Sequence, residues 1–270
     1  SVIVALGFTL LLFVKDFWGL LIYEMLLGVG ASFISGAEVS LLYDSMQADD
    51  DKTMIMGKLQ TNTLLGEAFA SLVCAAMMTI NFQAVVWAQV IIAWIPVVIA
   101  YKIVEPSIER MSSLNHKENI QEVLRYIFIN DKFIRLIFIN MLVWSLSTFF
   151  AVWIIQKYWQ DAGVDLPLIA LLWGGCLVIA AITTRSSSKL EKRFGAKSLL
   201  VVMCILPVVA YITMGMYSGL LGIGVTVFFY ISRGLNSVLM RDAFNSRLLP
   251  KFRNTANSLV SFCFRGFFFI

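Results

Sequence analysis

The sequence predicts an all-α membrane protein built as a polytopic helical bundle, and three observations lead to this class. Hydrophobic residues make up 59% of the 270 residues and charged residues only 14%, whereas a soluble domain carries about 25% charged residues. Most of the apolar runs are long enough to cross a hydrocarbon layer of about 30 Å as helices. Lysine and arginine are concentrated in every second connection between the runs, as expected of cytoplasmic loops.

Nine apolar runs each predict one spanning helix, and they occupy residues 1–14, 18–46, 59–80, 84–104, 135–155, 166–184, 198–216, 219–240 and 255–270. The first run is short and the last is cut at Ile270, so we expect a fragment with further spans at both ends. If the first run starts at the cytoplasmic face, 17 basic residues lie in cytoplasmic connections and only Lys15 and Lys157 on the other side. We therefore expect a multi-pass protein of the plasma or inner membrane.

One long polar connection divides the chain into three predicted parts. Residues 1–104 form an incomplete N-terminal bundle, residues 105–134 a cytoplasmic linker, and residues 135–270 an incomplete C-terminal bundle. Within the linker, five apolar residues recur on one helical face: Ile120, Val123, Leu124, Ile127 and Phe128. This pattern predicts a short amphipathic helix lying on the cytoplasmic membrane surface.

The second run combines small and acidic residues. Gly28, Ser32 and Gly36 recur every four positions, which predicts a surface that another helix can approach closely. Glu24 and Glu38 lie fourteen residues apart and so project within about 40° of each other around a helix. Because a carboxylate facing lipid is costly, this side should face protein or water. The run therefore predicts a spanning helix that borders a transport path.

The two sides of the linker also repeat each other. ISGAEVSLLYDS at residues 34–45 aligns with SRGLNSVLMRDA at residues 232–243, and Asp44 then falls on Asp242. A parallel repeat with six spans in each half is a transporter architecture.

At these residues the chain resembles the major facilitator superfamily, as helices three to eleven of twelve. EMLLGVGASFISGAEVSLLYDSM resembles the family's fourth helix, and SGAEVSLLYDS is similar to its drug-exporter-like branch. SSSKLEKRFGAK resembles the second-half signature loop, and NSRLLPKFRNTANSL is similar to the loop between helices ten and eleven. The resemblance implies an MFS-type bundle of two six-helix pseudo-repeats, both incomplete here. Glu24 stands where many members carry arginine.

The resemblance also implies that helices four, five, ten and eleven line or flank a central cavity. Away from the ends of the predicted spans, charged residues lie only on these four helices: Glu24, Glu38, Glu67, Arg233 and Arg265. Glu67 continues a polar stripe that contains Gln60 and Thr63 on one helical face. We expect Glu67 to carry a proton, or alternatively to form a structural ion pair with Arg233 or Arg265.

The remaining candidates are polar or aromatic residues on the same inner helices. Glu24 and Glu38 would bind substrate or protons, or else form gate pairs. Arg233 shares a helix with Tyr230 and Asn236, and would hold an anionic substrate or neutralise a glutamate. The helix that matches the family's seventh helix carries Asn140, Trp144 and Thr148 on one face. An aromatic and polar wall of this kind suits an amphipathic ligand. The aromatic residues of this helix also fit a packing role. At the cytoplasmic ends of their helices we expect two gating carboxylates, Asp44 and Asp242.

The sequence contains no set of residues typical of catalysis or cofactor binding. His116 is the one histidine and lies in a polar loop, and the four cysteines all lie inside apolar runs. We therefore expect no enzyme, no cofactor and no metal, and the basic loops indicate lipid rather than nucleic acid as the partner. The predicted function is monomeric, proton-coupled transport of a small amphipathic organic solute by alternating access. Two alternatives stay open: a transport-inactive scaffold or sensor, and a nutrient or metabolite importer.

Overall fold

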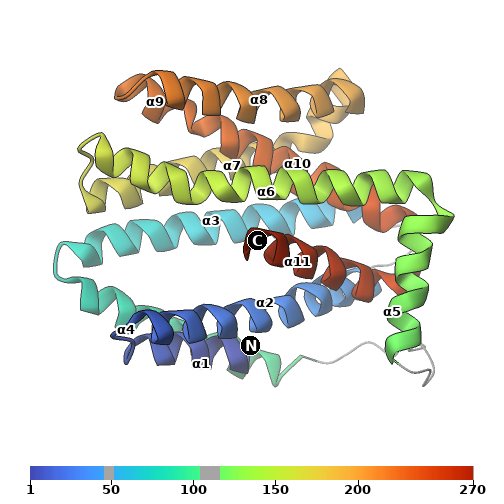
Figure 1. Ribbon diagram of the computed structural model, residues 1–270, viewed down its shortest axis with the longest axis horizontal. Helices are drawn as coiled ribbons and strands as arrows, with labels where there is room; N and C mark the ends of the chain where they lie inside the picture. Colours follow the sequence, from blue (N-terminus) through green and yellow to red (C-terminus); the bar gives the residue numbers. More distant parts are fainter. Residues whose placement is uncertain (46–51, 104–115, 270) are drawn as a thin grey trace. The chain divides into compact units, whose positions relative to one another are not determined.

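The computed structural model describes residues 1–45, 52–103 and 116–269, and it builds them from helices alone (Figure 1). In chain order the elements are α1 (Val2–Leu11), α2 (Phe17–Ser45), α3 (Lys52–Met78), α4 (Phe82–Ala100), α5 (His116–Arg125), η1 (Tyr126–Asn130), α6 (Lys132–Asp161), α7 (Leu166–Phe194), α8 (Ala196–Met216), α9 (Leu220–Val225), α10 (Val227–Arg247), η2 (Pro250–Phe252) and α11 (Arg253–Phe269). Among the described residues, seven segments are long and apolar enough to span a membrane, and α1 and α11 contain shorter apolar helices. The predicted class, an all-α polytopic membrane protein, is confirmed.

Local sequence signals explain where several helices begin and end. The Asn81 side chain accepts a hydrogen bond from the Ala84 backbone N–H at 2.7 Å and so caps the start of α4. The Asp131 carboxylate does the same for α6, accepting from the Phe133 N–H at 2.8 Å. Between α7 and α8, Gly195 adopts a φ of 78°, a left-handed conformation that side chains disfavour, so α8 begins immediately after α7 ends.

The chain divides into two compact units. The first comprises residues 1–48, 80–135 and 248–270, and the second comprises residues 49–79 and 136–247. The second unit therefore contains α3 together with α6 to α10, although α3 precedes the linker in sequence. The division into two bundles joined by a linker at residues 105–134 stays a prediction.

In the second unit, small residues let the helices approach closely. α3 packs along α7, where a Cβ atom added at Gly174 would lie 2.3 Å from the Ser71 Oγ. α10 packs against α7 in the same way, because a Cβ at Gly234 would lie 2.7 Å from the Ala180 carbonyl oxygen. The Thr184 hydroxyl donates to the Gly234 carbonyl at 3.2 Å across this contact. These contacts place α3 and α10 on the same neighbour, α7.

Two further hydrogen bonds tie α8 to its neighbours in the second unit. The Ser232 hydroxyl of α10 donates to the Met203 carbonyl of α8 at 3.0 Å. The Tyr211 hydroxyl of α8 donates to the Ser147 carbonyl of α6 at 2.6 Å. The apolar core of this unit is centred on α6, α7 and α10 and includes Ile155, Trp159, Leu177, Phe229 and Tyr230.

In the first unit, α1 packs against α2 and α4. A Cβ at Gly30 would lie 2.6 Å from a Val4 methyl, whereas no described atom would lie within 4 Å of one at Gly28. The predicted close approach is therefore absent at Gly28, and a close contact occurs two residues later, at Gly30. Gly36, the last residue of the predicted surface, lies outside the residues whose surroundings are described. The Trp94 indole N–H of α4 donates to the Thr9 hydroxyl of α1 at 3.2 Å.

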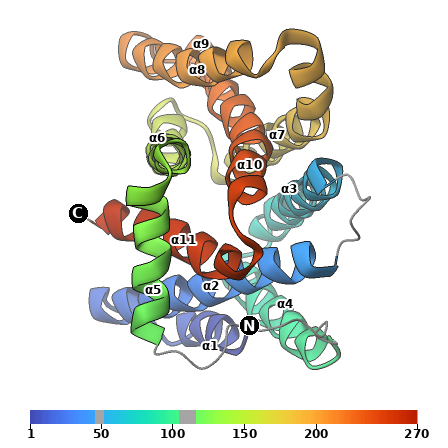
Figure 2. The ribbon, with the colours of Figure 1, turned by 90° about the vertical axis from the view of Figure 1, so that its right-hand side faces the viewer.

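The linker residues that the structure describes form α5 and η1. The Val123 and Ile127 side chains are buried, whereas Ile120 is exposed. In both views α5 runs across the direction of α2 and α11, which belong to the same unit (Figures 1 and 2). An interfacial helix has this orientation relative to spanning helices. Its place on the cytoplasmic membrane surface stays a prediction.

Candidate functional site

Tyr230 lies at the centre of the candidate site, in the second unit. Its side chain is 2% exposed, and its ring meets the edge of the Trp173 ring with centroids 5.7 Å apart. The Tyr230 hydroxyl has no hydrogen-bond partner among the described residues. Burying a hydroxyl without a partner costs about 1–3 kcal/mol, so this oxygen marks a place where a ligand or a water molecule would be stabilised.

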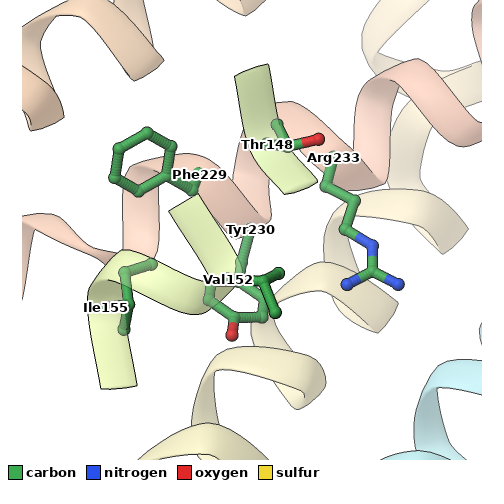
Figure 3. A pocket seen from close by; sticks show the side chains of 6 residues that line it. All are labelled: Thr148, Val152, Ile155, Phe229, Tyr230 and Arg233. Atoms are coloured by element: carbon green, nitrogen blue, oxygen red, sulfur yellow. The ribbon is translucent and has the colours of Figure 1, made fainter. Parts of the chain in front are cut away.

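A small pocket adjoins Tyr230 between α6 and α10, with a volume of about 10 Å³ (Figure 3). It is lined by Thr148, Val152, Ile155, Phe229, Tyr230 and Arg233. This volume is enough for about one water molecule. The Thr148 hydroxyl donates to the Trp144 carbonyl at 3.0 Å and keeps its oxygen lone pairs as acceptors. The pocket therefore has apolar walls with three polar groups at its edge.

Two candidates of opposite charge belong to this unit. Arg233 lines the pocket with Tyr230, whereas Glu67 is exposed on α3, which contacts both α7 and α10. Within the described part of the chain, neither Glu67 nor Arg233 forms an ion pair. The alternative of a structural pair between these two residues is therefore not realised in this structure. The pocket contains the base, and the acid lies on a neighbouring helix.

The sequence of α3 explains how Glu67 reaches this position. Leu64 and Ala68 are 1% and 4% exposed and form the packed face of the helix. Glu67 and Thr63 lie on the exposed side, and Gln60 is half buried. The predicted polar stripe thus borders the packed face rather than entering the core, so the Glu67 carboxylate remains accessible.

The other predicted residues of the second unit differ in their surroundings. The Asn140 amide donates to the Leu136 carbonyl of its own helix at 2.8 Å, and Trp144 is half buried. The Asn236 side-chain oxygen is buried and has no hydrogen-bond partner among the described residues. It is the second such atom on α10, after the Tyr230 hydroxyl. α10 therefore carries two buried polar atoms that lack a hydrogen-bond partner in the described structure.

The predicted place of Asp242 at the end of its helix is wrong. α10 continues to Arg247, because the polar residues after Asp242 stay helical. The Ser246 hydroxyl donates to the Asp242 carbonyl at 2.8 Å in this extension. The Asp242 side chain is half buried, and in the part of the chain that is described it forms no ion pair. Its gating role stays a prediction.

The remaining candidates lie in the first unit. Glu24 is exposed on α2. The side chains of Glu38, Asp44 and Arg265 lie outside the described residues. Of the predicted site residues in the second unit, Tyr230 and Arg233 line the same pocket.

Sequence reasoning missed two residues of α7 that pack in the same core as Tyr230. Trp173 contacts the Tyr230 ring, and Cys176 is 5% exposed within this core. Trp173, Cys176 and Ala180 recur at intervals of three and four residues on α7, the spacing of a packed helical face. That spacing was the signal available in the sequence.

No group of three or more histidine, cysteine, aspartate or glutamate side chains in the described ranges has the arrangement of a metal site. Residues 1–270 match the family model described as Major Facilitator Superfamily. No curated protein and no solved structure matches the chain significantly.

Proposed function

The chain belongs to the major facilitator superfamily of membrane transporters, and on this premise we propose that it is a proton-coupled secondary active transporter. It would move a small amphipathic organic solute across the cell membrane, as a monomer, by alternating access. The family makes it a multi-pass membrane transporter. The solute class, the coupling ion and the choice of membrane are our proposals.

One observation supports this function above the others: a buried hydroxyl without a partner lies in a pocket with a base, and a neighbouring helix carries an acid that does not pair with that base. The hydroxyl is that of Tyr230, the base is Arg233, and the acid is Glu67 on α3, which contacts α10. An unsatisfied buried oxygen is unfavourable unless something binds it. Charged side chains inside a spanning bundle are costly and are typical of substrate and ion pathways. The cluster therefore fits a site that exchanges ligands.

Proton coupling would follow from the charge balance of this cluster. With Glu67 ionised, Glu67 and Arg233 together carry no net charge. With Glu67 protonated, the cluster carries one positive charge and attracts an electron-rich or anionic group of the solute. Protonation can bias the two conformations of a transporter only if its free energy differs between them. We propose that the exposure of the Glu67 carboxylate changes between the inward-open and outward-open states.

The solute class is proposed from the composition of the pocket walls. In this structure the pocket has room for about one water molecule, so the solute would enter when the helices that line it move apart during alternating access. Val152, Ile155 and Phe229 provide apolar surface, whereas Thr148 and Arg233 provide hydrogen-bonding groups. Mostly apolar walls with a few polar groups favour a ligand that is itself amphipathic. A sugar would need many more hydrogen-bonding side chains than this pocket offers.

The first test identifies the ligand on the intact protein and then measures its transport. A thermal-stability screen would compare amphipathic cations, amphipathic anions, neutral amphipaths and sugars. We expect amphipathic compounds to raise the unfolding temperature, and the strongest of them to accumulate in proteoliposomes when a pH gradient is imposed. Stabilisation by sugars alone would contradict the proposed solute class. Equal flux with and without the pH gradient would contradict proton coupling.

A further inference from the structure

A second hollow, of about 360 Å³, opens between α7, α8 and α10 next to the turn at Gly195. Six apolar residues line it: Leu190, Phe194, Leu199, Val202, Ile231 and Leu235. Its two polar lining residues are Thr183 and Ser198, and the Thr183 hydroxyl already donates to the Ile179 carbonyl at 2.8 Å. This groove, which we call the α7–α8 groove, is therefore suited to a hydrocarbon chain rather than to a polar solute.

The α7–α8 groove extends from the predicted spans to the basic connection beyond them. Leu199, Val202, Ile231 and Leu235 line it from within the predicted spans, whereas Leu190 and Phe194 line it from the basic stretch of residues 185–197. One end of the groove is therefore at hydrocarbon depth and the other at the level of lipid headgroups.

The surface around the groove is apolar and exposed. Ile182 on α7 and Val201 and Ile205 on α8 are 60%, 50% and 53% exposed. In a membrane transporter, apolar side chains that are exposed on the outside of spanning helices contact lipid. The groove is therefore placed where lipid chains are available.

A basic rim follows the C-terminal part of α7 and the start of α8, the same stretch that contributes Leu190, Phe194 and Leu199 to the groove. Its five basic side chains are all exposed: Arg185, Lys189, Lys192, Arg193 and Lys197. Only one carboxylate, Glu191, lies in the same stretch. None of the five basic residues forms an ion pair with another described residue. The Arg193 guanidinium lies over the Phe194 ring, 5.4 Å from its centroid, and this ring lines the groove.

We propose that the α7–α8 groove binds one anionic phospholipid. The acyl chain lies against Leu199 and Val202, and the phosphate lies at the rim, within reach of Arg193 and Lys197. An arginine donates two parallel hydrogen bonds to a phosphate, and each basic residue near an anionic headgroup adds to the attraction. A phospholipid without net charge would use the apolar groove but gain less from the rim.

Two other occupants fit the observations less well. The transported solute has a separate pocket, because the α7–α8 groove and the pocket at Tyr230 have no lining residue in common. A second copy of the chain, packed symmetrically at this face, would bring two basic rims together and repel itself. An anionic lipid is the occupant whose charge complements the rim.

Native mass spectrometry of the intact protein in detergent tests the proposal, with phosphatidylglycerol and phosphatidylcholine as probes. The test variant is Arg193→Gln with Lys197→Gln, and the matched control is Lys58→Gln with Lys132→Gln, two exposed basic residues elsewhere. Each lost charge should weaken phosphatidylglycerol binding about fivefold. We expect a loss of about 25-fold in the test variant, little change in the control, and little change in phosphatidylcholine binding.

Val202→Trp tests the groove separately, because an indole there would fill it, and Val208→Trp on the exposed face of α8 is its control. We expect Val202→Trp to weaken phosphatidylglycerol binding and Val208→Trp to leave it unchanged. Equal wild-type affinity for the two lipids would overturn the proposal. So would displacement of the lipid by equimolar inorganic phosphate, or a dimer that persists in place of bound lipid.

Discussion

Arg233 follows Tyr230 by three residues on α10, and both side chains line the same small pocket. Figure 3 shows them projecting to the same side of the helix. One is a permanent cation, and the other is a buried hydroxyl with no hydrogen-bond partner in the described structure. The candidate site is therefore defined by two neighbouring residues of α10, and Glu67 lies on α3, a helix that contacts α10.

Tyr230→Phe removes the buried hydroxyl and keeps the ring. Because no hydrogen bond is lost, we expect the unfolding temperature to stay the same or rise slightly. If the hydroxyl binds the solute, affinity should fall by about tenfold, the effect of about 1.4 kcal/mol. Thermal unfolding and ligand titration on the same preparation measure both effects. Unchanged affinity would remove Tyr230 from the binding site.

Gly234→Ala tests the close approach of α10 to α7. The new Cβ would lie 2.7 Å from the Ala180 carbonyl oxygen, which belongs to the backbone and cannot rotate away. We expect a loss of about 1–3 kcal/mol in the free energy of unfolding. Gly175→Ala is the matched control, because no described atom lies within 4 Å of its added Cβ. It should be neutral, or stabilising by up to about 1 kcal/mol through helix propensity. Equal losses in the two variants would contradict the packing described.

The spanning helices could be predicted from the sequence because hydropathy depends on local composition. All nine predicted runs contain a helix, and the family assignment is confirmed. Helix ends are harder to predict. The hydropathy pattern predicts that the helix ends near Asp242, whereas α10 continues through polar residues to Arg247. Polar residues outside the hydrocarbon layer do not stop a helix unless a turn residue or a cap does.

The packing partners of the site could not be predicted, because they depend on tertiary contacts. The sequence placed Arg233 and Tyr230 on one helix, but it could not indicate that Tyr230 is buried against Trp173. Nor could it indicate that the small residue approached by α1 is Gly30 rather than Gly28. Spacing along one helix defines a face, whereas the identity of the neighbour depends on how helices pack.

The linker helix should be held mainly by apolar contacts rather than by its ion pair. The Lys251 Nζ lies 3.1 Å from a Glu122 carboxylate oxygen, and both side chains are about half exposed. Exposed pairs of this kind contribute at most about 1 kcal/mol. Ile127 is fully buried, and Ile127→Ala should cost about 2–5 kcal/mol. Chemical denaturation of Ile127→Ala and Glu122→Gln measures the free energy of unfolding that each variant loses. A larger loss of this free energy in Glu122→Gln than in Ile127→Ala would contradict the prediction.

The predicted orientation can be tested with single cysteines in a background that lacks the four native ones. Lys192→Cys lies in the last turn of α7, and Lys157→Cys lies near the C-terminal end of α6; both positions are exposed. We expect a membrane-impermeant maleimide added to intact cells to label position 157 and not position 192. In inside-out vesicles the pattern should reverse. Labelling of both positions from one side would contradict the assigned topology.

The central claim, that Glu67 couples solute movement to protons, is tested most directly by transport in proteoliposomes containing Glu67→Gln. Two assays are compared on the same vesicles: accumulation driven by a pH gradient, and exchange of labelled for unlabelled solute at equal pH. Glu191→Gln, which changes a carboxylate on α7 away from the pocket, is the control. The account predicts that Glu67→Gln loses gradient-driven accumulation and retains exchange, while the control keeps both. Gradient-driven accumulation at the wild-type level in Glu67→Gln would contradict it.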